Sequence, residues 1–219
     1  MPINMSFIYK VDAIINSSIE DTKYSFEIPK EKKVSNFITI DWEGIIPEPP
    51  SNESEITKDE LEYLSKLTRM RTPEDEELVR LVDKHPIRIY EEFARKHKLK
   101  IPMGRIEKAI EIITPIILNL KWKHNRPRPF QLARFYGLNI DVIKTDTHQT
   151  PAYPSGHTAQ AGIIAPIMAE EYPKYTSEFY ELVSRAGLAR CLQGVHYPTD
   201  NDVSMVISGA VWEDIRHRI

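Results

Sequence analysis

The sequence predicts an all-α domain, and three observations support this fold class. From Thr57 onward, apolar residues recur at intervals of three and four, as they do on the buried face of a helix. Several of these runs follow residues that favour helix starts. The chain has 219 residues, of which 41% are hydrophobic and 28% charged, which is typical of a soluble globular domain. We therefore expect one helical domain over residues 56–219.

Residues 1–55 have a different pattern. Short β-like runs lie at 6–11, 24–28 and 36–40, and residues 47–54 form a proline-containing linker. A segment of this size buries too little surface to fold easily by itself. We expect an N-terminal arm, extended or with a little β structure, that is suited to exchange between copies in a homo-oligomer.

The first helices are predicted from capping signals. Thr57 and Glu60 have the spacing of a capping box, and leucines follow at helical intervals (Leu61, Leu64 and Leu67). Thr72 followed by Pro73 favours a helix start, with the helix continuing to about Lys84. Another helix is expected from Pro86, with Ile89, Phe93 and His97 on one side.

The second half of the chain is predicted to hold longer helices. One runs over about 103–122, with isoleucines and a leucine on one face, and Pro115 inside it is expected to cause a kink. Residues 125–155 contain four prolines and weak periodicity, so we expect a long loop of the kind that often carries function. Helices are predicted again at 157–170, 175–193 and 199–216, the last capped by Thr199 and Asp202.

Three short segments at the ends of predicted helices contain the residues expected to act chemically. They are Lys121–Pro129, Tyr153–Thr158 and Arg190–Asp200, with the patterns K-x6-R-P, P-S-G-H and R-x5-H-x3-D. Together the patterns supply three cations, two histidines and one carboxylate. Such a set can hold a tetrahedral oxyanion and attack its central atom.

The first segment places Lys121 at a helix end and Arg128 between two prolines. Arginine suits bidentate contact with phosphate, and lysine adds a compact charge. Taken alone, the segment also fits a solvated basic helix end. A basic cluster (Lys121, Lys123, Arg126, Arg128 and Arg134) can contact nucleic acid, but the net charge of −3 and the lack of a wider basic surface favour no nucleic-acid partner.

The second and third segments each have a chemical and a structural interpretation. Ser155 and Gly156 leave backbone amides free at a helix start, where an anion binds readily, and His157 lies in the first turn. Alternatively, Ser155 only caps the helix and His157 is exposed. The step from His196 to Asp200 lets the carboxylate hold one imidazole nitrogen and aim the other outward as a nucleophile. Alternatively, Asp200 caps a helix.

Other sequence features favour a reduced, cytoplasmic protein without a cofactor. No apolar run reaches the roughly 20 residues of a membrane span, and the first residues do not resemble a signal peptide. Cys191 is the one cysteine, so an intrachain disulfide is excluded, and we interpret it as a small buried residue. Histidines and acidic residues show no spacing typical of a metal site.

The three segments in this order resemble the signature of the type 2 phosphatidic acid phosphatase (PAP2) and vanadium haloperoxidase superfamily. The charged and imidazole positions of that signature are matched by Lys121, Arg128, His157, Arg190, His196 and Asp200. The resemblance covers about residues 100–217 and is strongest to soluble class A nonspecific acid phosphatases, which share an aromatic residue before P-S-G-H. A family serine is replaced by Ala189.

The resemblance implies a helical bundle with the site between helices, and a reaction without metal. By this resemblance His196 attacks phosphorus and forms a phosphohistidine, Asp200 orients His196, and His157 protonates the leaving oxygen and then activates water. The remaining family positions hold the non-bridging oxygens (Lys121, Arg128, Ser155, Gly156 and Arg190).

We therefore expect a soluble, metal-independent phosphatase that hydrolyses phosphomonoesters or related phosphoanhydrides. A vanadium-dependent haloperoxidase, with vanadate as cofactor in the same cradle, is the first alternative. A non-catalytic protein that binds phosphorylated ligands or serves in an assembly is the second. The complete set of His157, His196 and Asp200 favours an enzyme, because a degenerate relative is expected to lose at least one of them.

Overall fold

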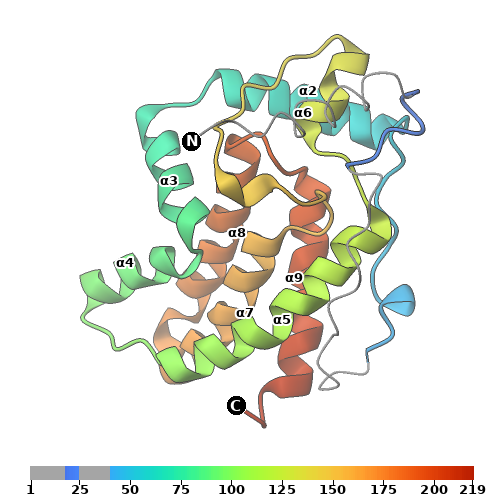
Figure 1. The fold of residues 1–219 in the computed structure, drawn as a ribbon. Coiled ribbons are helices and arrows are strands. Elements are labelled where there is room, and N and C mark those ends of the chain that lie inside the picture. Colours follow the sequence, from blue (N-terminus) through green and yellow to red (C-terminus); the bar gives the residue numbers. More distant parts are fainter. Residues whose placement is uncertain (1–17, 25–39) are drawn as a thin grey trace, which may run out of the picture.

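The computed structural model describes residues 18–24 and 40–219. Within these residues the chain forms helices joined by loops and short 3-10 turns, and no strand occurs among them (Figure 1). The predicted all-α class is confirmed for the described part of the chain. The predicted β-like runs lie wholly or mostly outside these residues, and the division into an arm and a helical domain stays a prediction.

The helices follow one another from the linker to the end of the chain. The first four are α2 (Glu55–Arg69), α3 (Pro73–Lys84), α4 (Ile87–His97) and α5 (Met103–His124). The others are α6 (Pro129–Leu132), α7 (Gly156–Glu171), α8 (Thr176–Leu192) and α9 (Pro198–Ile215). The 3-10 turns are η1 (Trp42–Gly44), η2 (Ala133–Tyr136), η3 (Asp146–His148) and η4 (Pro173–Tyr175). The predicted long helices therefore exist with ends shifted by one or two residues.

Helix α7 lies at the centre of the bundle and packs against α5, α8 and α9 (Figure 1). Between Ala161 and Ala169 its residues are apolar or small on every side, which is the pattern of a helix buried all round. Gly162 allows the close approach of α9, because a Cβ there would meet the Ser208 side chain. This packing fixes the N-terminal end of α7, where Ser155 and His157 lie.

A second, smaller apolar cluster joins α2 to the loop region. Leu61 and Leu64 of α2 are fully buried and belong to one cluster with Leu132, Cys191 and Tyr197. Helix α2 is thereby held beside the segment that precedes α9. Pro115 lies inside α5, as expected, and the predicted kink stays a prediction.

Two predicted capping signals are wrong. Helix α2 begins earlier because the Ser54 hydroxyl accepts a hydrogen bond from the Thr57 backbone amide at 3.2 Å, so Ser54 is the N-cap. Glu60 then lies in the second turn and is free to contact α9. At α9, Pro198 takes the first helical position, and the Asp200 carboxylate, rather than a Thr199 cap, accepts from the Tyr197 amide at 3.0 Å.

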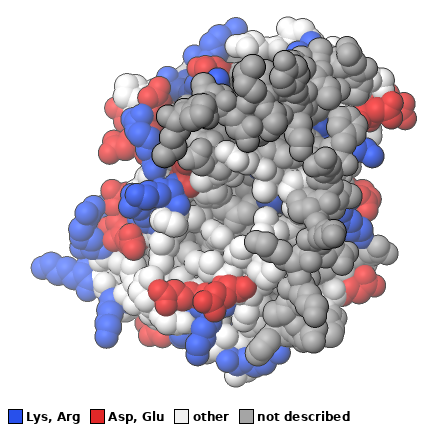
Figure 2. Space-filling model, viewed as in Figure 1, with Lys and Arg blue, Asp and Glu red and all other residues white. Residues whose placement is uncertain are grey.

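The surface and the helix lengths bear on the expected partners. On the face shown in Figure 2, basic and acidic residues are interspersed rather than gathered into one basic region. No helix among the described residues combines the length and the apolar character needed to cross a bilayer.

Candidate active site

The three predicted segments meet at one end of the bundle, around a cavity of about 190 Å³. Helix α5 contributes Lys121, the N-terminus of α7 contributes Gly156 and His157, and the loops contribute Arg128 and His196. The remaining lining residues are Thr114, Ile117, Leu118, Thr147, Thr150 and Gln160. The cavity thus joins cations and imidazoles that lie up to 75 residues apart in the sequence, from Lys121 to His196.

The other three predicted residues lie directly behind this lining. Ser155, Arg190 and Asp200 are at most 1% exposed. The Ser155 backbone amide donates to the Asp200 carbonyl at 3.1 Å, which ties the start of α7 to the start of α9. All eight predicted residues are therefore gathered in one region, five at the cavity wall and three buried against it.

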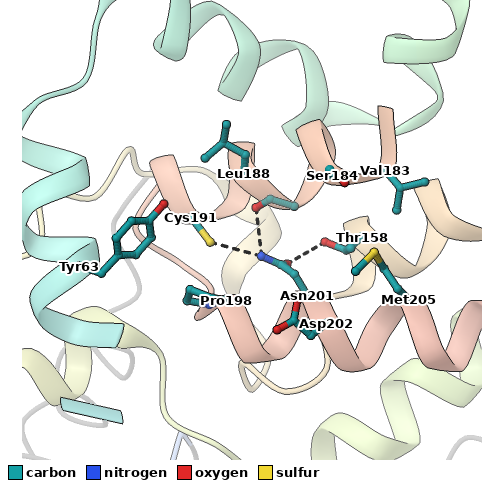
Figure 3. Close-up of a pocket in the computed structure, with 11 residues that line it drawn as sticks. Tyr63, Thr158, Val183, Ser184, Leu188, Cys191, Pro198, Asn201, Asp202 and Met205 are labelled. Carbon is teal, nitrogen blue, oxygen red and sulfur yellow. Dashed lines mark hydrogen bonds between the residues drawn. The ribbon is translucent and has the colours of Figure 1, made fainter. Parts of the chain in front are cut away.

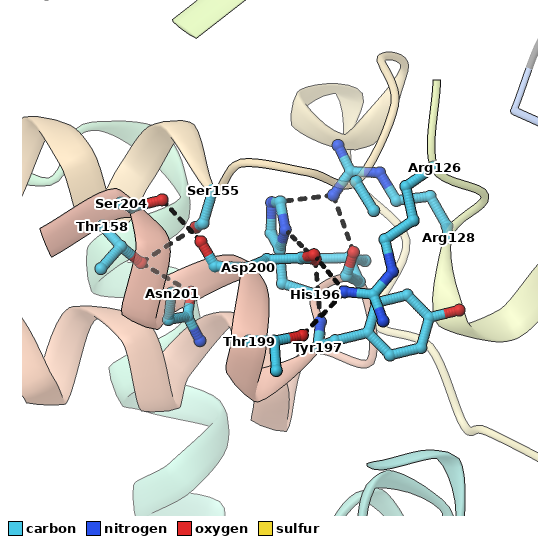
Figure 4. A network of polar contacts seen from close by, with 12 residues as sticks. Arg126, Arg128, Ser155, Thr158, His196, Tyr197, Thr199, Asp200, Asn201 and Ser204 are labelled. Carbon is cyan, nitrogen blue, oxygen red and sulfur yellow. Dashed lines mark hydrogen bonds and ion pairs between the residues drawn. The ribbon is translucent and has the colours of Figure 1, made fainter. Parts of the chain in front are cut away.

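His196 and Asp200 form a buried hydrogen-bonded pair (Figure 4). His196 Nδ1 lies 3.0 Å from Asp200 Oδ2. An ionised carboxylate only accepts, so Nδ1 carries the proton and Nε2 has the lone pair. Arg128 Nη1 donates to that Nε2 at 2.8 Å. Burial, followed by the nearby Arg128 and Lys121, holds the pKa of His196 well below its usual value, so the imidazole is neutral.

Lys121 and Arg128 do not form a solvated basic helix end, since they are 4% and 1% exposed. Lys121 Nζ donates to the carbonyls of Pro151 and Ala152 at 2.6 and 3.2 Å. Arg128 donates to the carbonyls of Thr150 and Val195 at 2.8 and 2.7 Å. Burial and the nearby Arg190 lower the pKa of Arg128 to about 9. Arg128 and Arg190 are therefore buried like charges that repel each other, and an anion bound between them would relieve this repulsion.

The start of α7 is arranged differently from a simple capped helix. The Ser155 side chain makes no capping bond to the helix backbone and instead lies 2.9 Å from the Thr158 hydroxyl. His157 lines the cavity, and its Nε2 donates to the Asp83 carbonyl at 2.8 Å. Burial and Arg190 lower the pKa of His157 to about 3. The sequence interpretation of an exposed His157 behind a capping Ser155 is therefore wrong.

Asp83, at the end of α3, is a site residue that sequence reasoning missed. Its Oδ1 accepts from Arg190 Nη1 at 2.7 Å and from Gln193 Nε2 at 3.1 Å, and it also accepts from the hydroxyls of Thr145 and Thr147. Burial opposes ionisation, but the hydrogen bonds from Thr147 and Arg190 prevail and lower the pKa of Asp83 to about 2. Asp83 therefore orients Arg190 through its carboxylate and His157 through its backbone.

The Arg190 guanidinium is only partly hydrogen-bonded within the described part of the chain. Its Nη1 and Nη2 contact Asp83 and Thr147, whereas its Nε is buried without a hydrogen-bond partner among the described residues. Ala189, at the position of the family serine, is fully buried among apolar side chains.

Known proteins resemble the part of the chain that contains this site. The family model described as the PAP2 superfamily matches residues 109–213. This region is similar to the PAP2 superfamily. The matched region contains the three motif segments. It excludes α2, α3, which contains Asp83, and α4.

A curated protein and solved structures are also similar to this chain. A non-specific acid phosphatase of Providencia stuartii is 32% identical over 118 residues, which are 52% of this chain and 44% of the relative. The chain thus spans less than half the length of the curated relative that it matches.

Two solved structures also match. LpxE of Aquifex aeolicus is 24% identical with a TM-score of 0.46, and the match covers 71% of this chain and 94% of LpxE. A transmembrane PAP2 type phosphatidylglycerolphosphate phosphatase of Bacillus subtilis is 16% identical with a TM-score of 0.48, over 76% of this chain and 90% of that protein.

A second pocket, of about 390 Å³, lies between α8 and α9 beside α2 (Figure 3). Its lining is mostly apolar and includes Cys191, whose thiol is buried, and burial raises the pKa of this thiol. The Asn201 amide donates to Cys191 Sγ at 3.3 Å and accepts from the Thr158 hydroxyl at 2.7 Å. Cys191 is thus a buried structural thiol, and none of the eight predicted site residues lines this pocket.

Proposed function

We propose that this protein is a phosphatase that hydrolyses phosphomonoesters, or related phosphoanhydrides, through a phosphohistidine on His196. The observation that carries the proposal is the His196 imidazole, neutral and held by Asp200, with its Nε2 directed at a cavity walled by Lys121 and Arg128. A nucleophile with a fixed lone pair beside buried cations is the arrangement that phosphoryl transfer requires.

In the first step, His196 Nε2 attacks phosphorus while the bond from phosphorus to the leaving oxygen breaks. Arg128 must first exchange its hydrogen bond to Nε2 for one to a phosphate oxygen. The imidazole becomes cationic when the nitrogen–phosphorus bond forms, and Asp200 stabilises that charge through Nδ1–H. Lys121, Arg128 and Arg190 offset the charge on the non-bridging oxygens, so the proposed chemistry proceeds without a metal.

His157 is the proposed proton donor to the leaving oxygen. Its Nε2–H is engaged by the Asp83 carbonyl, so the proton must come from Nδ1. In the free protein the pKa of His157 is about 3, because of burial and the neighbouring Arg190. A phosphate dianion between these cations reverses the sign of the local field and raises that pKa. Protonation of His157 is therefore coupled to substrate binding.

In the second step, His157 takes a proton from water, and the resulting nucleophile attacks phosphorus as the bond to His196 Nε2 breaks. The products are inorganic phosphate and the free histidine. Ser155 Oγ and the Gly156 amide, at the start of α7, are the proposed additional donors to the phosphate oxygens. We further propose that the protein acts in the cytoplasm and that residues 1–55 form an arm distinct from the catalytic domain.

The proposal is tested by hydrolysis of para-nitrophenyl phosphate between about pH 4 and 8 in the presence of EDTA. His196→Ala should lower kcat by about 10³-fold or more, because it removes the nucleophile. The exposed His217 serves as the matched control, and His217→Ala should retain full activity. Activity that persists in His196→Ala would refute the mechanism.

The alternatives predict different outcomes of the same experiment. Oxidation of bromide by peroxide, dependent on added vanadate and inhibited by phosphate, would identify a haloperoxidase. Binding of phosphate with neither activity would identify a non-catalytic phospholigand-binding protein.

A further inference from the structure

A buried chain of charges extends from the candidate active site to α2. Arg126 is 3% exposed and bridges Asp200 and Glu60, which are 0% and 7% exposed. Arg126 Nη1 lies 2.7 Å from Asp200 Oδ1, and Nη2 lies 3.0 Å from Glu60 Oε2. In the sequence Arg126 belongs to a cluster of basic residues that can contact nucleic acid, and in the structure its side chain is buried.

This chain completes the hydrogen bonding of the Asp200 carboxylate. Its Oδ2 accepts from His196 Nδ1 and from the Tyr197 amide, both at 3.0 Å. Its Oδ1 accepts from Arg126 (Figure 4). Because both oxygens are engaged, the carboxylate cannot rotate without breaking one of these bonds. The plane of Asp200, and with it the direction of the His196 ring, is therefore set in part by Arg126.

Arg126 is itself fixed from three sides. Its guanidinium carbon lies 3.7 Å from the centre of the Tyr197 ring, and its Nη1 also donates to the Thr199 hydroxyl at 2.8 Å. Glu60 binds its Nη2 and also accepts from the Thr199 backbone amide at 2.7 Å. Glu60 thus joins α2 to both Arg126 and the first turn of α9.

Glu60 also decides how strongly Arg126 competes with His196 for Asp200. The guanidinium lies between two carboxylates, so its charge is shared between them. Without the Glu60 charge, Arg126 would draw more of the Asp200 charge and weaken the hydrogen bond from His196. A neutral residue at position 60 would therefore leave the His196 nucleophile less basic and less firmly oriented.

We propose that Glu60 and Arg126 are positioning residues that act on His196 through Asp200. Helix α2, which lies outside the matched region at 109–213, is then part of the catalytic unit rather than only a covering helix. The inference rests on the proposed function, in which His196 is the nucleophile. A purely structural tether between α2 and α9 is the competing explanation, and the two make different predictions.

The test compares Glu60→Gln with Glu62→Gln, an identical change at an exposed position of the same helix. With para-nitrophenyl phosphate, Glu60→Gln should lower kcat by about 10-fold and change KM by less than about 2-fold. A loss of about 10-fold is typical when a residue that orients a functional histidine through a hydrogen bond is replaced. Glu62→Gln should match the wild type, and Glu60→Asp, which keeps the charge, should recover part of the activity. A structural tether predicts lower stability with an unchanged kcat of the folded protein.

A double-mutant cycle asks whether Glu60 acts through Arg126. Arg126→Lys keeps the charge but cannot bridge two carboxylates with a planar fork, so it should also lower kcat by about 10-fold. In that background, Glu60→Gln should have an effect of less than about 2-fold. Fully additive losses would overturn the proposal. If Glu60→Gln does not fold, a folded Arg126→Lys with wild-type kcat would overturn it as well.

A spectroscopic readout separates this inference from the proposed function. The proton on His196 Nδ1 can be followed by NMR as the imidazole resonance that His196→Ala removes, with and without inorganic phosphate. Glu60→Gln should shift this resonance, and Glu62→Gln should not. If the wild type hydrolyses no phosphoester, the proposed function fails, and the NMR comparison still decides the inference. An unmoved resonance in Glu60→Gln would overturn it.

Discussion

Replacement of Asp83 by Asn would remove one negative charge from the point where α3, the η3 turn and α8 meet. The Asp83 carboxylate accepts hydrogen bonds from Arg190, Gln193 and two threonines, and its side chain is 13% exposed. Asparagine has nearly the same shape, and its amide oxygen can still accept up to two of these bonds. The substitution therefore tests the contribution of the charge rather than of packing.

The magnitude follows from the pKa of this carboxyl group. The pKa falls from its usual 3.8 to about 2, because hydrogen bonds from Thr147 and Arg190 outweigh the opposing effect of burial. Since one pKa unit corresponds to about 1.4 kcal/mol, the charged form is favoured by at most about 2.5 kcal/mol. Solvent screening reduces this value, and we expect Asp83→Asn to lower the free energy of unfolding at neutral pH by about 1–2 kcal/mol.

The direction of the pKa shift decides how the stability difference between wild type and Asp83→Asn changes with pH. A carboxyl group with a depressed pKa in the folded state stabilises the protein above its unfolded pKa, and the contribution is lost as pH falls through the folded pKa. The difference in unfolding free energy between wild type and Asp83→Asn should therefore be constant above about pH 5 and diminish between about pH 4 and 2.

Urea unfolding of both proteins over this range measures the difference directly. Glu77→Gln, at an exposed position of the same helix, is the control for the loss of a charge at the surface and should change stability little. An Asp83→Asn protein as stable as wild type at neutral pH would refute the reasoning. A difference in unfolding free energy that stays unchanged down to about pH 2 would also refute it.

Two further predictions follow from other parts of the structure. Gly162→Ala should lower the free energy of unfolding by about 1–3 kcal/mol, because its Cβ would lie 2.9 Å from Ser208 Cβ. Gly104→Ala, which would have no atom within 4 Å of its Cβ, should be neutral or slightly stabilising. Equal effects of the two substitutions in thermal unfolding would contradict the packing of α7 on α9. Binding of sulfate, a dianion that does not titrate in this range, should be accompanied by proton uptake at about pH 5–6, because the anion raises the low pKa of His157. Calorimetry in two buffers of different ionisation enthalpy measures this uptake, and an unchanged value in His157→Ala would contradict the assignment.

The sequence was sufficient to find the motif segments because their residues lie in short windows at helix ends. Arg190, His196 and Asp200 span eleven residues, and their spacing across a turn indicates a shared site. Amphipathic periodicity is strong in α2–α4, whereas α7–α9 are apolar on most sides, and the bounds of α5 and α7–α9 were still predicted to within two residues. The pairing of His196 with Asp200 followed from the same local spacing.

Sequence reasoning could not find the residues that support the site from distant helices. Asp83 contacts Arg190 across 107 residues, and Glu60 contacts Thr199 across 139 residues. Each is one acidic residue on a charged helix, and its neighbours in sequence give no sign of burial. The Thr57–Glu60 spacing instead indicates a capping box. Only the packing of α2 and α3 against the start of α9 and the end of α8 distinguishes these acids from solvated ones.

The central claim is that His196 is the nucleophile, and the most direct measurement is the location of phosphate on the protein during turnover. Wild type would be mixed with para-nitrophenyl phosphate that carries a radioactive phosphorus isotope. The reaction would be quenched in alkali, in which a phosphohistidine survives. We expect label on the peptide that contains His196, and none in His196→Ala. Label on a different residue, or product formed in the first turnover without any labelled protein, would contradict the account.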